Sequence, residues 1–440
     1  MTRTEPARGM RDYLPEDIRR REHVIGVIRR VYERYGFEPL ETPAVENLET
    51  LMGKYGDEGN QLIFKILKRG EHEASGQADL ALRYDLTVPL ARVVAQYQGK
   101  LPRLFKRYQI QPVWRADRPA RGRFREFYQC DVDALGSTSP VVEAEVCAAV
   151  TDALTELGFA DFTIRLNHRQ LLTSILNAAG IAESLHGTAL VAVDKLDKIG
   201  ADGVKSEMLT RGIDAPAAAK LLELFDLLGK EREQCRNVLD EAGIAAFENL
   251  EAVFAHALGT SAAAHLGFDP SLARGLSYYT GAIMEIAVPD LAGSLGGGGR
   301  YDNLVGMFLG QSVPACGFSL GLERILVVMG ERGMFPPNLM TTAADVMMAV
   351  FDASDAPHAL RVAGLLRQTG LRVLVYPDAD KIGKQIKYAD SLGIPFVAIL
   401  GGNEIAAGTV TVKNLAAQTQ HTYDQAAAGG AILEGLRQRG

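Results

Sequence analysis

The chain has little cysteine, and its cysteines show no metal-binding spacing. Four are present in 440 residues, Cys130, Cys147, Cys235 and Cys316, and no two of them form the CxxC spacing of a zinc site or redox motif. So few cysteines in so long a chain do not suggest a disulfide framework either. A reducing, cytoplasmic setting fits this composition best.

Long apolar runs and excess positive charge are also missing. No segment approaches the roughly 18 apolar residues of a membrane span, and the segment Met1–Met10 is polar and charged. We therefore expect neither export nor membrane insertion. The net charge of −7 argues against sequence-blind binding of DNA or another polyanion, which depends on excess Lys and Arg. Any RNA contact must come from local basic patches.

The common nucleotide-binding loops are absent too. The sequence contains neither GxGxxG nor GxxxxGK[ST], so we expect no Rossmann or P-loop site. With 440 residues, of which 47% are apolar, the chain exceeds what one hydrophobic core organises. Two or three domains are the expectation.

Periodicity and composition predict an α+β chain with a helical insertion. Arg19–Tyr35 has the apolar spacing of an amphipathic helix that ends at Gly36, and prolines make 37–46 extended. Residues 80–136 predict antiparallel hairpins, and an Ala- and Leu-rich region predicts a helical insertion over 168–258. We predict a first domain over 1–332 and an independent module of alternating strands and helices over 343–440.

The segment RADRPARGRFREFYQ concentrates basic charge between two expected strands. Five arginines lie in it, Arg115, Arg118, Arg121, Arg123 and Arg125. Because a guanidinium group makes paired contacts to phosphate oxygens, this hairpin suits a phosphorylated ligand. A solvated basic hairpin is the alternative.

The strand after this hairpin favours the ligand interpretation. Phe127 is followed by the polar residues Gln129, Asp131 and Asp133 at alternate positions, so all three lie on one face. Polar side chains on a face that is otherwise buried need a partner.

Two further segments carry polar groups suited to a small ligand. In LRYDLTVPLAR, Asp85 and Thr87 lie two residues apart and could bind an ammonium group, or they could cap the helix that follows. RGLSYYTG begins at Arg274 and is followed by GGGGRYD, in which four glycines let the backbone approach a ligand closely. A flexible linker is the alternative.

GFSLGLERI turns into an expected helix that carries Arg324.

Taken in order, these segments resemble the class II aminoacyl-tRNA synthetases, and among them the histidyl-tRNA synthetase family. TPAVE around Pro43 resembles the first class II motif, the arginine hairpin the second, and GLERI the third. RGLSYYTG followed by GGGRYD is similar to two segments characteristic of the histidine enzymes. The resemblance extends over essentially the whole chain.

The resemblance implies a fold and an activity. The fold is an antiparallel sheet of six or seven strands flanked by helices, which forms a catalytic domain over 1–332, with an anticodon-binding α/β domain over 343–440. The activity is the ATP-dependent activation of L-histidine and its transfer to tRNA(His), by a homodimer whose interface includes the first motif. Mg²⁺ arrives with the nucleotide, and no metal site of the protein itself is expected.

The resemblance also assigns roles to individual residues. Arg274 and Arg115 are the catalytic residues that stabilise charge on the α-phosphate. Phe127 stacks on adenine, which Asp117 also contacts, although glutamate is more common there. The remaining ATP-binding residues are Arg123 and Arg324, and the histidine-binding residues are Asp85, Thr87, Gln129, Asp133, Tyr278, Tyr279 and Tyr301. A buried pair of Asp133 and Tyr279 is expected to select the imidazole ring.

Three other interpretations remain open at this point. A synthetase-like regulatory subunit of histidine biosynthesis would bind histidine without charging tRNA, but such proteins lack the C-terminal module. A synthetase for another amino acid would share the second and third motifs but not RGLSYYTG. A non-enzymatic RNA-binding domain would not need the full set of arginines.

Overall fold

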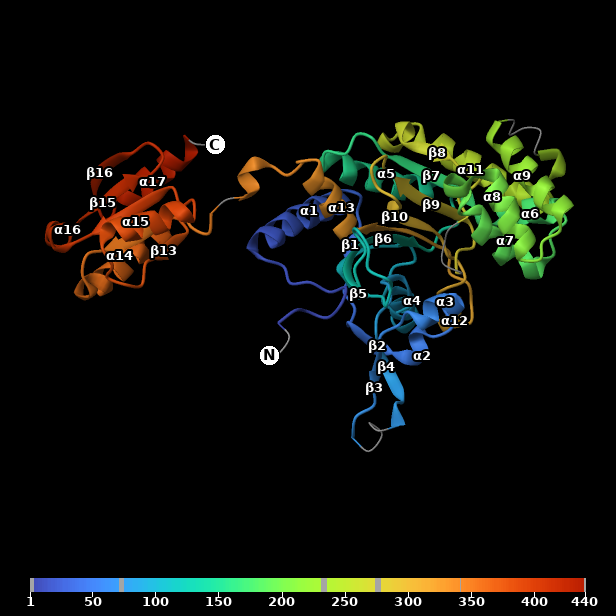
Figure 1. The fold of residues 1–440 in the computed structure, drawn as a ribbon, viewed down its shortest axis with the longest axis horizontal. Helices are drawn as coiled ribbons and strands as arrows, with labels where there is room; N and C mark the ends of the chain where they lie inside the picture. The colour runs from blue at the N-terminus through green and yellow to red at the C-terminus, as the bar shows by residue number, and fades with distance from the viewer. Residues whose placement is uncertain (1–3, 71–74, 231–235, 274–277, 341, 439–440) are drawn as a thin grey trace. The chain divides into compact units, whose positions relative to one another are not determined.

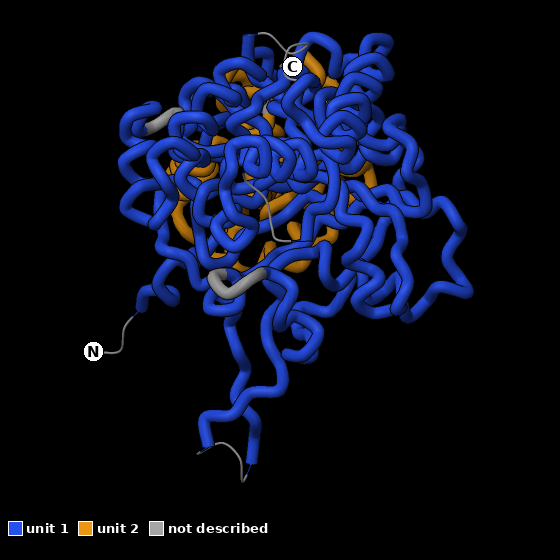
Figure 2. The backbone as a smooth tube through the Cα atoms, turned by 90° about the vertical axis from the view of Figure 1, so that its right-hand side faces the viewer, with its two compact units in different colours: residues 1–335 blue, residues 336–440 orange. Residues whose placement is uncertain are grey.

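The computed structural model describes residues 4–70, 75–230, 236–273, 278–340 and 342–438. The chain divides into two compact units, Met1–Phe335 and Pro336–Gly440, which Figure 2 colours separately. Each unit has its own apolar cores, so each is described by itself.

An eight-stranded sheet organises unit 1. Its strand order is β1-β5-β6-β11-β10-β9-β7-β8. The six inner strands pair antiparallel, and the short outer strands β1 and β8 join in parallel. The bounds are β1 Glu38–Pro39, β5 Phe105–Trp114, β6 Glu126–Leu135, β7 Thr163–His168, β8 Leu266–Phe268, β9 Ala282–Ala287, β10 Ser294–Arg300 and β11 Ala315–Gly321.

Three long helices pack against one face of this sheet. They are α1 Pro15–Arg34, α5 Val141–Glu156 and α13 Leu322–Glu331, which lie together in Figure 1. Apolar residues from α1, such as Val24 and Ile28, share the largest core with Cys130 and Val132 of β6. Since side chains alternate along a strand, Asp131, which lies between them, points to the opposite face of the sheet.

A smaller layer lies at the other side of unit 1. A three-stranded sheet of order β2-β4-β3 carries a hairpin that projects from the body of the unit (Figure 1). Short helices and a second apolar core accompany it. The bounds are β2 Val45–Asn47, β3 Lys65–Leu67, β4 Ala78–Leu82, α2 Leu48–Leu51, α3 Gly56–Gln61, α4 Thr87–Gln96 and α12 Gly306–Leu309.

Between β7 and β8 the chain forms the helical insertion. Its helices, green to yellow in Figure 1, are α6 Arg169–Ala178, α7 His186–Val193, α8 Leu196–Thr210, α9 Ala215–Lys230 and α11 Glu241–Ala257. The helix α11 packs on both α6 and α5, so the insertion shares its apolar core with the sheet domain.

Unit 2 is a five-stranded sheet of order β13-β12-β14-β15-β16 with helices. The strands β13, β12 and β14 are parallel, and β15 and β16 continue antiparallel. The bounds are β12 Val346–Val350, β13 Val373–Val375, β14 Phe396–Leu400, β15 Thr409–Asn414, β16 Thr419–Asp424, α14 Ala356–Gln368, α15 Ile382–Ser391, α16 Gly402–Ala407 and α17 Ala428–Arg437.

The predicted α+β fold is confirmed, with three differences in detail. The sheet has eight strands instead of six or seven, because β1 and β8 add short parallel pairings at its edges. The glycine run is a central strand, β10, and not a linker. The elements β16 and α17 were not predicted, since β16 is polar and exposed along most of its length and gives no apolar alternation.

None of the helices in the described parts of the chain has the length and apolar character needed to cross a bilayer.

Candidate active site

A pocket of about 370 Å³ opens on the sheet face opposite α1 and α5. Residues from β6, β9, β10, β11 and the arginine hairpin line it. Among the predicted site residues, its lining includes Asp85, Thr87, Arg115, Asp117, Arg123, Phe127, Gln129, Tyr278, Tyr279 and Arg324. These residues are spread over nearly 240 positions, and the sheet brings them together.

The β5–β6 hairpin places a cation beside two aromatic rings. The guanidinium carbon of Arg115 lies 4.3 Å from the ring centroid of Tyr84 and 5.2 Å from that of Phe127. Its Nε donates to the Tyr84 carbonyl over 2.9 Å. Because the stem is held by stacking and a hydrogen bond, the remaining guanidinium donors have a restricted orientation.

A second cation enters from α13. The guanidinium group of Arg324 donates to the carbonyl of Ser294 on β10, and the side chain lies against Gly122 at the hairpin tip. Gly122 has φ +67° there, which permits the tight turn between Ala120 and Arg123. The pocket therefore has guanidinium groups from two different elements, an arrangement that suits a phosphorylated ligand.

Asp85 lies at the amino end of α4 and is almost fully buried. Its carboxylate accepts hydrogen bonds from Tyr55 Oη at 3.0 Å, from Tyr278 Oη at 3.3 Å and from the amide of Val88 at 3.1 Å. Burial raises the pKa of Asp85, and these donors oppose that rise. The helix-end interpretation is confirmed, since Asp85 accepts the amide of Val88. The ammonium-binding interpretation stays a prediction, and both Asp85 and Thr87 line the pocket.

Gln129 leaves one acceptor unused in the pocket. Its Nε2 donates to Ser319 Oγ over 2.7 Å, whereas its Oε1 is buried without a hydrogen-bond partner. A buried carbonyl oxygen without a partner costs about 1–3 kcal/mol. Since Gln129 lines the pocket, this oxygen is placed to accept a hydrogen bond from an N–H group that enters the pocket.

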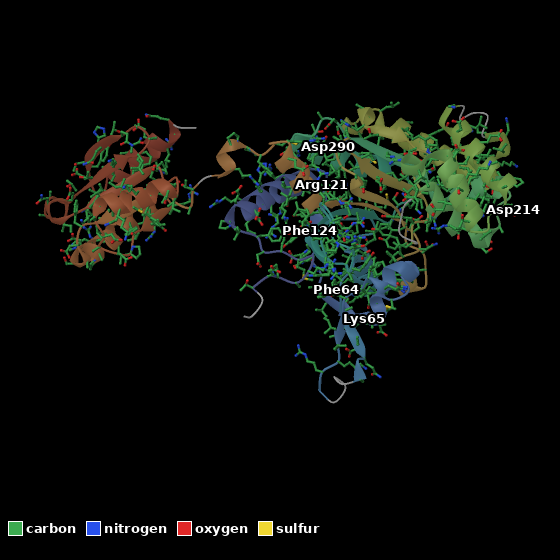
Figure 3. All side chains as sticks on the ribbon, in the orientation of Figure 1. Phe64, Lys65, Arg121, Phe124, Asp214 and Asp290 are labelled. Atoms are coloured by element: carbon green, nitrogen blue, oxygen red, sulfur yellow. The ribbon has the colours of Figure 1, made fainter. Side chains whose placement is uncertain are left out.

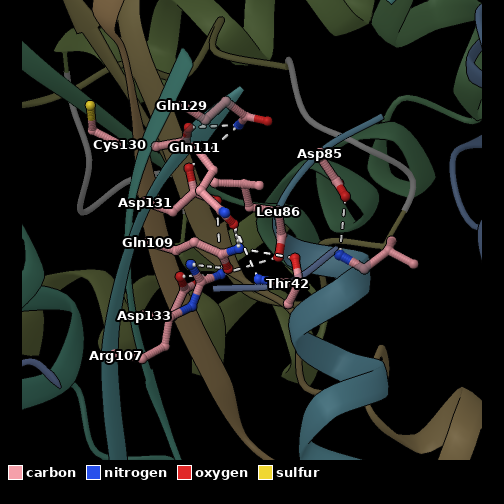
Figure 4. Close-up of polar contacts among 12 residues, drawn as sticks. Thr42, Asp85, Leu86, Arg107, Gln109, Gln111, Gln129, Cys130, Asp131 and Asp133 are labelled. Carbon is pink, nitrogen blue, oxygen red and sulfur yellow. Dashed lines mark hydrogen bonds and ion pairs between the residues drawn. The ribbon is translucent and has the colours of Figure 1, made fainter. Parts of the chain in front are cut away.

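Beneath Gln129, a buried ionic cluster supports the pocket floor (Figure 4). Arg107 is fully buried on β5, with its NH2 group 2.9 Å from Asp133 and 3.9 Å from Asp131. The pKa values of both carboxyl groups are raised by burial, which Arg107 opposes. Asp133 and Tyr301 are both buried and do not line the pocket.

The structure gives Asp133 a hydrogen-bond partner in Tyr301, and the expected joint role of Asp133 and Tyr279 in selecting the imidazole ring stays a prediction. The hydroxyl of Tyr301 donates to Asp133 Oδ1, and Tyr279 lines the pocket. The reason is geometric: Tyr301 directly follows β10, two strands from β6, and its buried hydroxyl reaches the polar face of β6. Spacing along the sequence does not reveal which tyrosine reaches that face.

Arg274 lies outside the described residues. The segment is flanked by Leu272 and Tyr278, both of which line the pocket.

The glycines of β10 allow β10 and β11 to lie close together at the floor of the pocket. Gly296, Gly297 and Gly298 line the pocket. A Cβ atom on Gly298 would lie 2.7 Å from the Cα of Phe318 on β11, closer than real contacts allow. The glycines thus serve both the packing of β10 on β11 and the floor of the pocket.

Among the residues of the site and its support that were not predicted, four are aromatic or charged. Phe124, Glu285 and Glu323 line the pocket, and Arg107 holds its floor. A charged residue within an otherwise apolar strand, as Glu285 in AIMEIA, is a signal that could have located one of them. Within the described residues, no group of three or more His, Cys, Asp or Glu side chains is arranged to hold a metal ion.

Comparisons with known proteins assign the family. The family model "Histidyl-tRNA synthetase" matches residues 9–325, and "Anticodon binding domain" matches 345–434. The chain is 40% identical to the histidine–tRNA ligase of Flavobacterium johnsoniae, covering 95% of this chain and 96% of that one. It is 41% identical to that of Gloeobacter violaceus, covering 98% of each.

Solved structures agree with these matches. The histidyl-tRNA synthetase of Nostoc sp. PCC 7120 superposes with a TM-score of 0.79 at 32% identity, covering 99% of this chain and all of that one. An ATP phosphoribosyltransferase regulatory subunit/histidyl-tRNA synthetase from Bacillus halodurans has a TM-score of 0.74 at 22% identity, covering 91% of this chain and 99% of that one. The latter likeness shows the fold alone.

The antiparallel sheet, its arginine hairpin and the α13 arginine make this chain a class II aminoacyl-tRNA synthetase. Within that class, the chain belongs to the histidyl-tRNA synthetase family.

The close packing at Gly317 predicts a stability effect. A Cβ atom there would lie 2.5 Å from Asp133 Cγ and 2.9 Å from the Val132 carbonyl oxygen. We expect Gly317→Ala to lower the free energy of unfolding by about 1–3 kcal/mol, measured by urea unfolding with the fluorescence of Trp114, the single tryptophan. Gly330→Ala, where nothing lies within 4 Å, should be neutral or stabilising. Equal effects would contradict the packing argument.

The buried carboxyl of Asp131 predicts a pH effect on stability. Burial raises its pKa to about 7, so between pH 4 and 7 the folded protein retains a proton that the unfolded chain releases. The free energy of unfolding should therefore fall as pH rises through this window, by at most about 1.4 kcal/mol per unit. In Asp131→Asn this contribution disappears. The free energy of unfolding of both proteins is measured by urea unfolding at pH 5 to 8. If it depends on pH in the same way in the wild-type protein and in Asp131→Asn, this assignment is refuted.

Proposed function

We propose that this protein activates L-histidine with ATP and transfers it to tRNA(His). The observation that carries the proposal is the composition of one pocket. A buried, unpartnered Gln129 Oε1 lies in the same cavity as the Asp85 carboxylate and the stacked pair of Arg115 and Phe127. The first two suit an ammonium group, and the last two suit a nucleotide.

In the activation step, the histidine carboxylate attacks the α-phosphorus of ATP. A new oxygen–phosphorus bond forms, the bond from the α-phosphorus to the bridging oxygen breaks, and pyrophosphate leaves. Arg115 and Arg274 are proposed to stabilise the negative charge on the non-bridging oxygens. No side chain has to act as a nucleophile.

The nucleotide lies along the arginine hairpin in this proposal. Phe127 stacks on adenine beside Asp117, and Arg123 and Arg324 contact the outer phosphates. Mg²⁺ bound with ATP draws charge from the pyrophosphate leaving group. The carboxylates that line the pocket, among them Glu285, fit a nucleotide that brings its own cation.

Histidine occupies the other part of the pocket. Asp85, Thr87 and Gln129 receive its ammonium group, and Tyr278 orients Asp85. Tyr279 faces the imidazole, with Asp133 and Tyr301 beneath it. Since buried polar groups would be left unpaired by an isostere, such a site discriminates strongly against other amino acids.

In the second step, a ribose hydroxyl at the 3′ end of the tRNA attacks the histidyl carbonyl carbon, and AMP leaves. The anticodon-binding module in unit 2 supports a tRNA substrate. That module and 40% identity to a histidine–tRNA ligase over 95% of the chain do not favour a regulatory subunit.

The experiment that tests this function is ATP–pyrophosphate exchange with each of the twenty amino acids, without tRNA. Exchange with histidine alone is expected. Arg115→Ala should lower that exchange at least a hundredfold, because a charge-stabilising donor is lost.

Arg121→Ala is the matched control on the same hairpin. Arg121 is exposed, pairs with Glu331, and donates to the carbonyl of Asp290 on the outside of the hairpin (Figure 3). It should keep exchange within about twofold. Histidine binding without exchange in the wild-type protein would refute the proposed enzyme.

We also propose that the protein is a homodimer with the Pro43 segment in its interface. The half-exposed Val45 on the short strand β2 follows that segment, and edge strands favour pairing with another chain. Sedimentation velocity at micromolar concentration should give twice the mass of 47.6 kDa. A monomer under those conditions would contradict the dimer.

A further inference from the structure

A segment before α1, residues 9–13, lies against the arginine hairpin. We call it the N-terminal strap, and it precedes α1 in the blue part of Figure 1. The carbonyl of Gly9 accepts the amide of Arg125 over 2.7 Å. Gly9 has φ +81°, and a Cβ atom there would lie 2.9 Å or less from Pro119 and Arg125 side-chain atoms. The strap is therefore seated on the hairpin by close backbone contact.

Two arginines hold Tyr13 in this position. The guanidinium carbon of Arg11 lies 4.4 Å from the ring centroid of Tyr13 and 4.4 Å from that of Phe124, which lines the pocket. The guanidinium carbon of Arg21, on α1, lies 4.6 Å from the ring centroid of Tyr13 and 4.9 Å from that of Tyr128. Stacks of cations and rings restrict the Tyr13 side chain to one orientation.

The hydroxyl of Tyr13 reaches a buried carboxylate at the pocket. It donates to Glu323 Oε1 over 3.2 Å, while Glu323 Oε2 accepts the amide of Tyr128 over 2.9 Å. Glu323 is 1% exposed. Burial raises the pKa of Glu323 to about 7, and the hydrogen bonds from Tyr128 and Tyr13 oppose that rise.

The ends of this hydrogen-bond chain adjoin the two ends of the nucleotide site. Tyr128 directly follows Phe127 on β6, and Glu323 directly precedes Arg324 on α13. The bond from Tyr128 to Glu323 therefore sets how far the aromatic platform lies from the outer-phosphate arginine. A ligand that spans both is sensitive to errors of about 1 Å in that separation.

We propose that Tyr13, held by Arg11, is a positioning residue for ATP that keeps Glu323 between β6 and α13 and so fixes the spacing of Phe127 and Arg324. This inference rests on the proposed function, because it takes ATP as the ligand of those two residues. Tyr13 does not line the pocket, and its hydroxyl contacts Glu323, which does.

The test uses the full-length protein with Tyr13→Phe, which keeps the ring and removes only the hydroxyl. We expect the Kd of ATP, by equilibrium dialysis, to rise about five- to tenfold, since a hydrogen bond to a carboxylate is lost. The KM of ATP in histidine-dependent exchange should rise by the same factor. The KM of histidine should stay within about twofold, because the side chains of Asp85 and Gln129 are held by hydrogen bonds with Tyr55, Tyr278 and Ser319 instead of Tyr13 or Glu323.

The matched control is Tyr35→Phe, which removes a similar hydrogen bond at the other end of α1. Tyr35 Oη donates to Asp152 over 2.7 Å, on the helix face of the sheet. It should leave both KM values unchanged. Arg11→Met is a second variant, which removes the cation from the stack and should shift ATP binding alone by about two- to fourfold.

These outcomes separate the inference from the proposed function. An unchanged Kd of ATP in both Tyr13→Phe and Arg11→Met overturns the inference, as does an equal rise in the KM of ATP and of histidine. If Tyr13→Phe does not fold, Arg11→Met decides. The exchange assay on the wild-type protein alone decides the function. The ratio of the Kd of ATP in the variant to that in the wild-type protein, from equilibrium dialysis, tests the strap without any turnover.

Discussion

Arg107 is the residue on which the floor of the site depends. It lies fully buried in β5, and two carboxylates on the neighbouring strand surround it. A buried guanidinium without partners costs several kcal/mol, and so does an unpaired carboxylate. Each group is therefore tolerable only because the others are present, and together they hold the polar face of β6 against β5. That face carries Gln129 into the pocket.

The glycines of β10 impose the complementary constraint. A side chain at Gly298 would collide with β11, so the strands can approach only because that position has none. The same gap leaves room above the sheet for a ligand. The polar face of β6, supported by Arg107, and the glycine strand β10, two strands away, form a charged floor, while the arginines of the hairpin and of α13 line the pocket beside it.

Much of this arrangement was predictable because it depends on local patterns. The helix over Arg19–Tyr35 and the hairpin that carries Arg115 follow from apolar periodicity and turn residues, and both are present. Phe127 and Gln129 were expected to lie near a ligand, and both line the pocket. The strand β10 escaped prediction because glycine has no side chain to show alternation. The partner of Asp133 also escaped it, since Tyr301 reaches that carboxylate only after β10, β11 and β6 pair.

The sequence by itself determined the family, the order of the main elements and several of the residues that line the pocket, because motif spacing and periodicity are properties of neighbouring positions. Only the tertiary structure decided that Arg107 supports Asp133, and that Tyr13 reaches Glu323 across 310 positions. Such contacts join residues from separate elements, and their geometry is set by strand order and helix packing. No local pattern encodes them, because the two partners lie far apart in the sequence.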